Sequence, residues 1–192
     1  IYVLALTKSH RSFIDNNLIK NNKDISKIEG NIFINKMKNN FKIIIGNKTK
    51  KLKIDNDEIK KISDYISRLN IIIFYPEDLD LIKGSPNIRR HFLNSELSQL
   101  NNKYLNILGE YNKILKIRND YLKKKSKGEF IDETYFQIIT NYLIDKGILI
   151  YKMRKKFVDK LNENCGKIFE EITKIPGFKE VCTSPSMSWL IF

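Results

Sequence analysis

The sequence has few residues of the kinds that form cross-links, metal sites or membrane spans. Its 192 residues include only 2 cysteines, 4 prolines and a single tryptophan. Cys165 and Cys182 are too isolated for a disulfide framework or a zinc site, and the apolar spacing around Cys165 indicates a packed thiol. The longest apolar runs, such as Ile71 to Tyr75, fall far short of the roughly 20 residues that cross a bilayer. We therefore predict no membrane association, and the apolar start without a basic region fits a signal peptide poorly.

Several catalytic motifs are also missing. No G-x-x-x-x-G-K-[ST] pattern occurs, so the sequence has no backbone nest and lysine of the kind that cradles nucleotide phosphates. There is no G-x-S-x-G motif, and the two histidines, His10 and His91, are far in sequence from either cysteine. We predict neither a catalytic nucleophile nor a metal site.

Positive charge is abundant. The 35 Lys and Arg residues exceed the 22 Asp and Glu residues, which gives a formal net charge of +13. A hydrophobic content of 42% with 30% charged residues is typical of a globular protein with an ordinary core. The excess favours phosphate backbones or acidic membranes as partners, although the Lys, Ile and Asn bias also fits the codon usage of an AT-rich genome.

The first half of the chain mixes short helices and strands. The apolar run Ile1 to Leu6 predicts the end of a buried helix. Short β-branched runs between Ile25 and Ile54, separated by Asn, Gly and Lys, predict an antiparallel strand group. Asp57 predicts the N-cap of a helix that runs to about Arg68. The run Ile71 to Tyr75 predicts a buried strand that ends at Pro76.

The second half has a helical period. Beyond Ser95, apolar residues recur at spacings of three and four and form a heptad seam that only Arg118 interrupts. The seam consists of Leu97, Leu100, Tyr104, Ile107, Tyr111, Ile114 and Tyr121. KKKSKGE at Lys123 to Glu129 predicts a polar tip, after which a second apolar helix runs from Tyr135 to Ile172. Together these features predict an antiparallel helical hairpin that Pro176 and Gly177 end.

These patterns predict an α/β (α+β) chain in three parts. Residues 1–94 form an incomplete α/β head portion, residues 95–176 form a helical arm, and residues 177–192 form an atypical tail. The last thirteen residues, EVCTSPSMSWLIF, differ abruptly from what precedes them. A frameshift, a cloning-derived sequence or a lineage-specific end would each account for this change.

Two cationic groups are candidates for binding phosphate. Lys8 and Arg11 follow the first helix, where cations also simply favour the helix dipole. Arg89 and Arg90 open a helix after the Gly84-Ser85-Pro86 turn. Because adjacent residues on a helix point about 100° apart, at most one of these arginines faces the core, and the other either contacts phosphate or forms an internal salt bridge.

A third basic run lies on the second helix of the predicted arm. It consists of Lys152, Arg154, Lys155 and Lys156. With the lysines of the tip, it forms either a solvated face or a surface that follows DNA phosphates. Because no aromatic ladder accompanies these cations, we predict weakly sequence-specific binding without base stacking.

Two adjacent acids, Glu77 and Asp78, follow the predicted buried strand and Pro76. Neighbouring side chains on such a turn point apart, so they are not an acid and base pair. Either they favour a helix dipole, or they stand at a sheet edge where α/β folds hold ligands.

Three strings together resemble a known family. They are TKSHR at Thr7 to Arg11, YPEDLDLIKGSPNIRRHFLN at Tyr75 to Asn94, and YNKILKIRNDYLK at Tyr111 to Lys123. From Ile1 to about Lys179 the chain resembles the RecF family, bacterial recombinational repair ATPases related to SMC and ABC-type heads. The resemblance implies a partial ABC/SMC-like ATPase head lobe with an antiparallel helical-hairpin arm. Such proteins carry a P-loop upstream and signature and Walker B motifs downstream, so this sequence resembles the middle of a RecF cut at both ends.

The resemblance implies a cytoplasmic protein that binds single-stranded and gapped DNA in an ATP-dependent manner during replication, recombinational repair and the SOS response. It also implies ATP and Mg²⁺ as cofactors, an ATP-dependent homodimer, and RecO and RecR as partners. Arg11 would contact a phosphate, and Glu77 would polarise a metal-bound water or report the nucleotide state. Without the motifs that position phosphoryl groups, this chain alone is not expected to hydrolyse ATP. The alternative is a non-catalytic helical-hairpin interaction module that uses its apolar seam to dimerise or to bind a partner helix.

Overall fold

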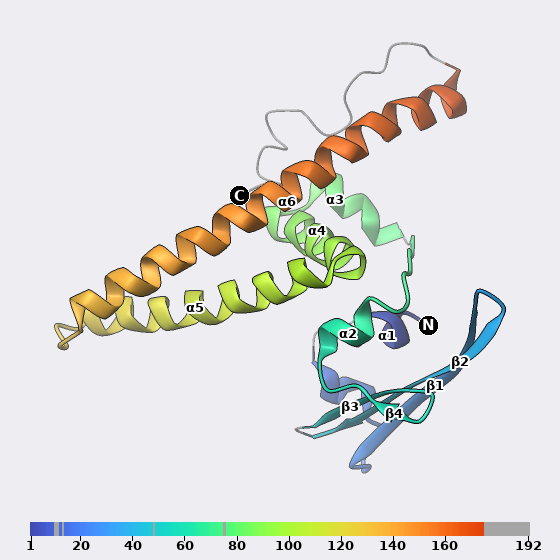
Figure 1. The fold of residues 1–192 in the computed structure, drawn as a ribbon, viewed down its shortest axis with the longest axis horizontal. Helices are drawn as coiled ribbons and strands as arrows, with labels where there is room; N and C mark the ends of the chain where they lie inside the picture. Colours follow the sequence, from blue (N-terminus) through green and yellow to red (C-terminus); the bar gives the residue numbers. More distant parts are fainter. Residues whose placement is uncertain (10–11, 13, 48, 75, 175–192) are drawn as a thin grey trace. The chain divides into compact units, whose positions relative to one another are not determined.

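The computed structural model describes residues 1–9, 12, 14–47, 49–74 and 76–174, in which the chain forms two compact units (Figure 1). Unit 1 comprises Ile1–Asp78 and Ser98–Asn102, and unit 2 comprises Leu79–Leu97 and the residues from Lys103 onward. The units thus divide after Asp78, while the domain boundary near residue 94 stays a prediction. The predicted helix end at Pro176 and the tail at 177–192 lie outside the described residues.

Unit 1 is built on an antiparallel four-stranded sheet, which confirms the predicted strand group. The strands, in order across the sheet, are β1 (Ile25–Ile34), β2 (Met37–Gly46), β3 (Lys50–Ile54) and β4 (Asp57–Glu58). Alternation along β2 buries Phe41, Ile43 and Ile45 on one face. Helices α1 (Tyr2–Leu6) and α2 (Ile62–Ile66) contribute Leu4 and Tyr65 to the same core, beside the 3-10 helix η1 (Asp15–Leu18).

The structure corrects two predictions in unit 1. Asp57 does not cap a helix: it pairs with Ile54 in β4, because the chain turns back at Asp55 (φ 55°) and extends the sheet. The segment 71–74 is not a buried strand, since Ile72 and Phe74 are 88% and 82% exposed. A strand needs a neighbouring backbone for its ladder, and none of the four described strands pairs with this segment. Its anchor is the Ile71 amide, which donates to Gln99 Oε1 at 2.7 Å.

Unit 2 consists of helices. The short η2 (Pro76–Leu79) crosses the division and leads into α3 (Asp80–Lys83), α4 (Pro86–Leu100), α5 (Asn102–Ser126) and α6 (Glu133–Thr173). Helices α5 and α6 lie side by side and are joined by a short tip, where Gly128 adopts φ 73° (Figure 1). Asp132 caps α6 by accepting a hydrogen bond from the Tyr135 amide.

Contacts between α5 and α6 confirm the antiparallel hairpin. Along α5 the pairing residues ascend while those on α6 descend: Tyr104 meets Arg154, Glu110 meets Lys146 and Arg118 meets Thr140. The seam has one break, because α4 ends at Leu100 and α5 starts at Asn102, so Leu100 is 62% exposed. No helix in the described part of the chain is both long and apolar enough to cross a membrane.

Candidate nucleic-acid interface

The base of the hairpin holds one of the predicted DNA-binding residues in its interior. The Arg154 side chain is only 7% exposed. Its Nε donates to the Tyr104 hydroxyl at 3.1 Å and its Nη2 donates to Asn94 Oδ1 at 2.8 Å. Burial raises the pKa of the Tyr104 hydroxyl, although the nearby Arg154 charge opposes this shift. The grouping of Arg154 with the exposed lysines is therefore corrected: this arginine joins α4, α5 and α6.

The three lysines of that run lie elsewhere on α6. Lys152, Lys155 and Lys156 are exposed and border a shallow hollow on the outside of the helix. The hollow is also bordered by Tyr151, Asp159, Lys160 and Glu163. Lys155 Nζ forms an ion pair with Asp159 at 3.1 Å, so acids within this surface offset part of its charge.

The arginines of α4 make bonds within their own unit. Arg89 is half-buried, and its Nη1 donates to the carbonyls of Leu81 and Gly84 at 3.2 and 2.9 Å, where α3 ends. Arg90 donates to Asn87 Oδ1. A Cβ on Gly84 would lie 2.5 Å from the Asp80 carbonyl oxygen, so this turn requires glycine. The internal contacts of Arg89 are with carbonyl groups, whereas the sequence suggested a carboxylate or a phosphate.

The cation at the C-terminal end of α1 is Lys50, which the sequence analysis did not single out. The sequence analysis had considered Lys8 and Arg11 for this role. Lys50 Nζ donates to the Thr7 carbonyl at 2.6 Å and forms an ion pair with Asp15 at 2.7 Å. A cation at this position satisfies a free carbonyl at the end of α1. Lys8 is exposed beside it, and Arg11 lies outside the described residues. The period-two pattern of β3 could have revealed Lys50, since it shares the inward parity of Leu52.

Glu77 belongs to η2, and its side chain lies outside the described part of the structure. Among the described side chains, no group of three His, Cys, Asp or Glu could hold a metal ion. The sequence also lacks the lysine-containing phosphate loop. Neither a cluster of metal-ligating side chains nor a phosphate-binding loop is therefore found among the residues that the structure describes.

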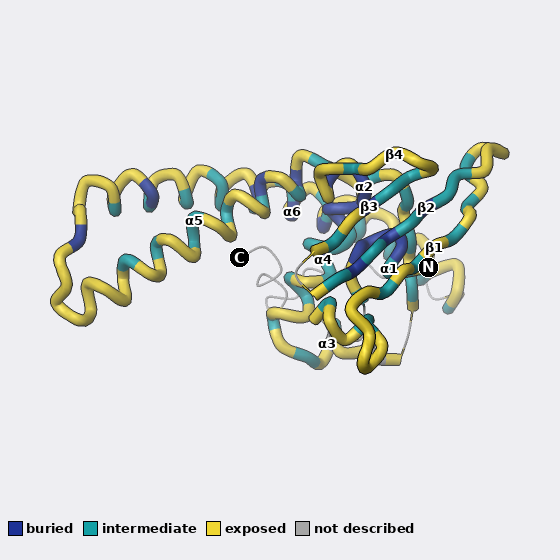
Figure 2. Tube along the Cα trace, turned by 90° about the horizontal axis from the view of Figure 1, so that it is seen from below, coloured by how far each residue is buried: buried dark blue, intermediate teal, exposed yellow. Residues whose placement is uncertain are grey.

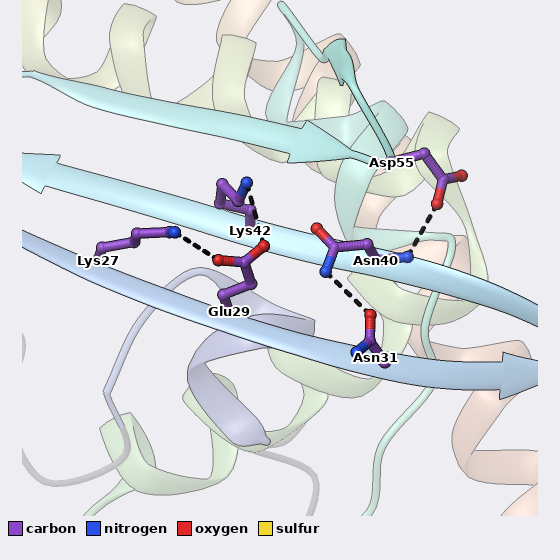
Figure 3. A network of polar contacts seen from close by, with 6 residues as sticks. All are labelled: Lys27, Glu29, Asn31, Asn40, Lys42 and Asp55. Atoms are coloured by element: carbon purple, nitrogen blue, oxygen red, sulfur yellow. Dashed lines mark hydrogen bonds and ion pairs between the residues drawn. The ribbon is translucent and has the colours of Figure 1, made fainter.

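The outer face of the sheet carries a polar network that the sequence did not predict (Figure 3). Glu29 forms ion pairs with Lys27 at 2.5 Å and Lys42 at 3.0 Å. Hydrogen bonding from Lys27, followed by that from Lys42, lowers the pKa of Glu29 from 4.5 to about 2. Beside them, Asn40 Nδ2 donates to Asn31 Oδ1 at 3.0 Å. The carboxylate balances part of the lysine charge on this face.

Comparison with known proteins gives relatives of one kind. The chain is 38% identical over 174 residues to the DNA replication and repair protein RecF of Latilactobacillus sakei subsp. sakei (strain 23K). It is 40% identical over 174 residues to the protein of the same name from Geobacillus sp. (strain WCH70). Both alignments cover 91% of this chain and 46% of the relative, so the chain spans about half the length of the curated relatives it matches. No protein-family profile matches the chain.

Solved structures give the same result for the fold. A structure described as the recombination mediator protein RecF-ATPrS in the RecFOR pathway matches with a TM-score of 0.83 and 26% identity, over 90% of this chain and 47% of that one. A RecF-ATP structure from the same pathway matches with a TM-score of 0.83 and 25% identity, over 98% and 54%. The predicted resemblance is therefore confirmed, and over 91% of its length the chain is similar in sequence and fold to about half of a RecF DNA replication and repair protein.

Proposed function

We propose that this chain acts in DNA replication and repair as a DNA-binding part of a RecF-like protein. The observation that carries the proposal is the 38% identity over 174 residues to a RecF, together with the shared fold. The net charge of +13 and the exposed lysines of α5 supply the attraction to phosphate. Binding of this kind depends on counterion release and is only weakly sequence-specific.

The finer functional predictions belong to the same proposal. For a RecF-like protein that carries a phosphate loop, they are ATP-dependent binding of single-stranded and gapped DNA, a role in the SOS response, an ATP-dependent homodimer, partnership with RecO and RecR, and a cytoplasmic location. ATP binding is supported by the solved RecF-ATP neighbour, for that protein. Arg11 and Glu77 stay proposed as residues near the nucleotide, with Mg²⁺ as its companion ion. Because this sequence has no phosphate loop, we expect ATP hydrolysis only where such a loop is supplied.

The proposal is tested by measuring the affinity of the purified chain for labelled single-stranded, gapped and duplex DNA. Titrations at several salt concentrations should show log affinity falling linearly with log salt, and added ATP should leave the affinity of this chain unchanged. Absence of binding at low salt, or an affinity that does not respond to salt, would contradict the proposal.

A second function, the helical-hairpin interaction module, is favoured by one observation. Eight large apolar side chains on α6 are at least two-fifths exposed: Tyr135, Ile138, Tyr142, Ile144, Ile148, Leu149, Ile168 and Ile172. Tyr135, Ile138, Tyr142 and Leu149 recur at helical spacings of three, four and seven, and apolar side chains exposed along one helix face mark protein contacts. Sedimentation of the wild type against Ile138→Glu distinguishes the two functions. Self-association that the substitution abolishes, with no DNA binding by either chain, would favour the module.

A further inference from the structure

The positive charge of the hairpin is concentrated on one of its two helices. Helix α5 carries seven Lys and Arg residues against two Asp and Glu residues, a net charge of +5 in 25 residues. Helix α6 carries seven against six, a net charge of +1 in 41 residues. An anionic polymer would therefore be attracted more strongly to α5 than to α6, where the sequence analysis placed Lys152, Lys155 and Lys156.

The unpaired cations of α5 form a line along its solvent side. Core residues such as Tyr104, Ile107 and Tyr111 recur at spacings of three and four. A second line with the same spacings runs two residues later, which on a helix is the opposite side. This outer line consists of Asn106, Gly109, Lys113, Lys116, Asp120 and Lys123. All six are exposed, and Figure 2 shows exposed residues recurring along α5.

The charges of the lysines in the outer line are not offset by ion pairs within the described part of the protein. Lys113, Lys116 and Lys123 form no ion pair among the described residues. The acid Glu110 is committed to Lys146 of α6, which leaves Asp120 as the one carboxylate of the outer line. From Lys113 to Lys123 the helix rises about 15 Å. Along the axis of a DNA duplex one strand places about four phosphates in that length, and an extended single strand places fewer.

The tip of the hairpin, which follows the end of α5, carries an exposed aromatic ring. Phe130 is 93% exposed, more than any other large apolar side chain of the described structure. It follows Gly128, and the backbone turn there includes a hydrogen bond from the Glu129 amide to the Lys124 carbonyl. An exposed ring seven residues after Lys123 can stack on a base, and unpaired bases expose their faces along a strand, whereas a duplex exposes them only at its ends.

We propose that the outer line of α5 and Phe130 form a binding strip for single-stranded nucleic acid. In this proposal, which rests on the proposed DNA-binding function, Lys113, Lys116 and Lys123 contact successive phosphates and Phe130 stacks on an unpaired base. A membrane surface fits less well, because the outer line has no apolar side chain to insert between lipids. With this strip, the hairpin would bind single-stranded nucleic acid in preference to a duplex. The sequence pattern alone did not indicate base stacking.

The test compares matched triple variants of the full 192-residue chain by fluorescence anisotropy, with labelled oligo-dT and a blunt duplex as probes. Lys113→Gln, Lys116→Gln and Lys123→Gln together should reduce the salt slope for oligo-dT by about 2 and the affinity by about tenfold or more. The control, Lys152→Gln with Lys155→Gln and Lys156→Gln, removes the same charge from α6 and should change the affinity less than about threefold.

The aromatic part is tested separately. Phe130→Ala should lower the affinity for oligo-dT by about tenfold and leave duplex affinity and the salt slope unchanged. Phe130→Trp should restore oligo-dT binding, and Phe33→Ala, which removes another exposed ring in unit 1, should have no effect. Circular dichroism of each variant verifies the helical content.

The outcomes separate this inference from the proposed function. Equal losses in the two triple variants, or an effect of Phe130→Ala on both probes alike, overturn the strip while DNA binding stands. A wild-type chain that binds neither probe overturns both. Binding to vesicles of anionic lipid without binding to either DNA probe also overturns both.

Discussion

The two long helices of the hairpin have the same number of cations but use them differently. On α6, Arg154 is buried against Tyr104, Lys146 pairs with Glu110 and Lys155 pairs with Asp159. On α5, Lys113 and Lys116 point into solvent at the spacing of one helical face. The comparison shows that a run of basic residues in a sequence does not by itself form a basic surface. The surface charge depends on which side of the helix each cation occupies and on which acidic side chains lie beside it.

The largest expected effect concerns the buried cation of α6. Arg154→Ala should lower the free energy of unfolding by about 3 kcal/mol, because it removes packing and two hydrogen bonds at the base of the hairpin. The exposed neighbour provides the control, since Lys156→Ala should cost less than about 0.5 kcal/mol. Urea unfolding of both variants measures the difference, and equal costs would refute the structural role of Arg154.

The α5 side of the same contact should have a smaller effect. Tyr104→Phe keeps the ring in the core but removes the hydroxyl that accepts from Arg154 and donates to Asn94. We expect a loss of about 1–2 kcal/mol. A double-mutant cycle with Arg154→Ala should show clear coupling, since the two side chains share one network. Additive losses would mean that the two residues act independently.

Each of the two long helices contains a glycine, so the effect of adding a side chain can be compared between them. A Cβ on Gly109 of α5 would meet nothing within 4 Å, so Gly109→Ala should stabilise the protein by about 1 kcal/mol. A Cβ on Gly147 of α6 would lie 3.6 Å from the Tyr111 ring, an ordinary contact. Gly147→Ala should therefore also stabilise, whereas Gly147→Leu should destabilise by crowding that ring. Thermal melts measure the order of the three, and a lower melting temperature for Gly109→Ala would count against the open surface of α5.

The smallest effect is expected at the ion pair that joins the helices. Hydrogen bonding of the Lys146 ammonium to Glu110, followed by that to Tyr142, raises the pKa of Lys146 above its ordinary value of 10.5. A raised pKa means that this pair stabilises the fold fully below pH 10.5 and that the contribution disappears as the pH rises through the folded pKa. The stability difference between wild type and Glu110→Gln should therefore be constant near neutral pH and vanish in alkaline solution. A difference that grows with alkaline pH would contradict this assignment.

Hairpin and sheet could be predicted from local patterns, because apolar spacings of three and four, or of two, directly reflect helix and strand geometry. The prediction failed at Asp57, where a β-turn competed with a good N-cap residue. It also failed at Ile72 and Phe74, since an apolar run predicts burial only if a partner strand is present. The burial of Arg154 could have been inferred, because it lies four residues from both Ile150 and Val158 on the apolar side of α6.

The sequence by itself determined the resemblance to RecF, the antiparallel sheet and the helical hairpin, since each depends on motifs or periods within short stretches of chain. The tertiary structure decided which cations are free. Lys50 reaches the end of α1 across 43 residues, and Arg154 reaches Asn94 across 60. Contacts at such separations arise from packing of whole elements, and no local period encodes them. For that reason, only the folded chain shows α5 to be the basic helix with a free outer face.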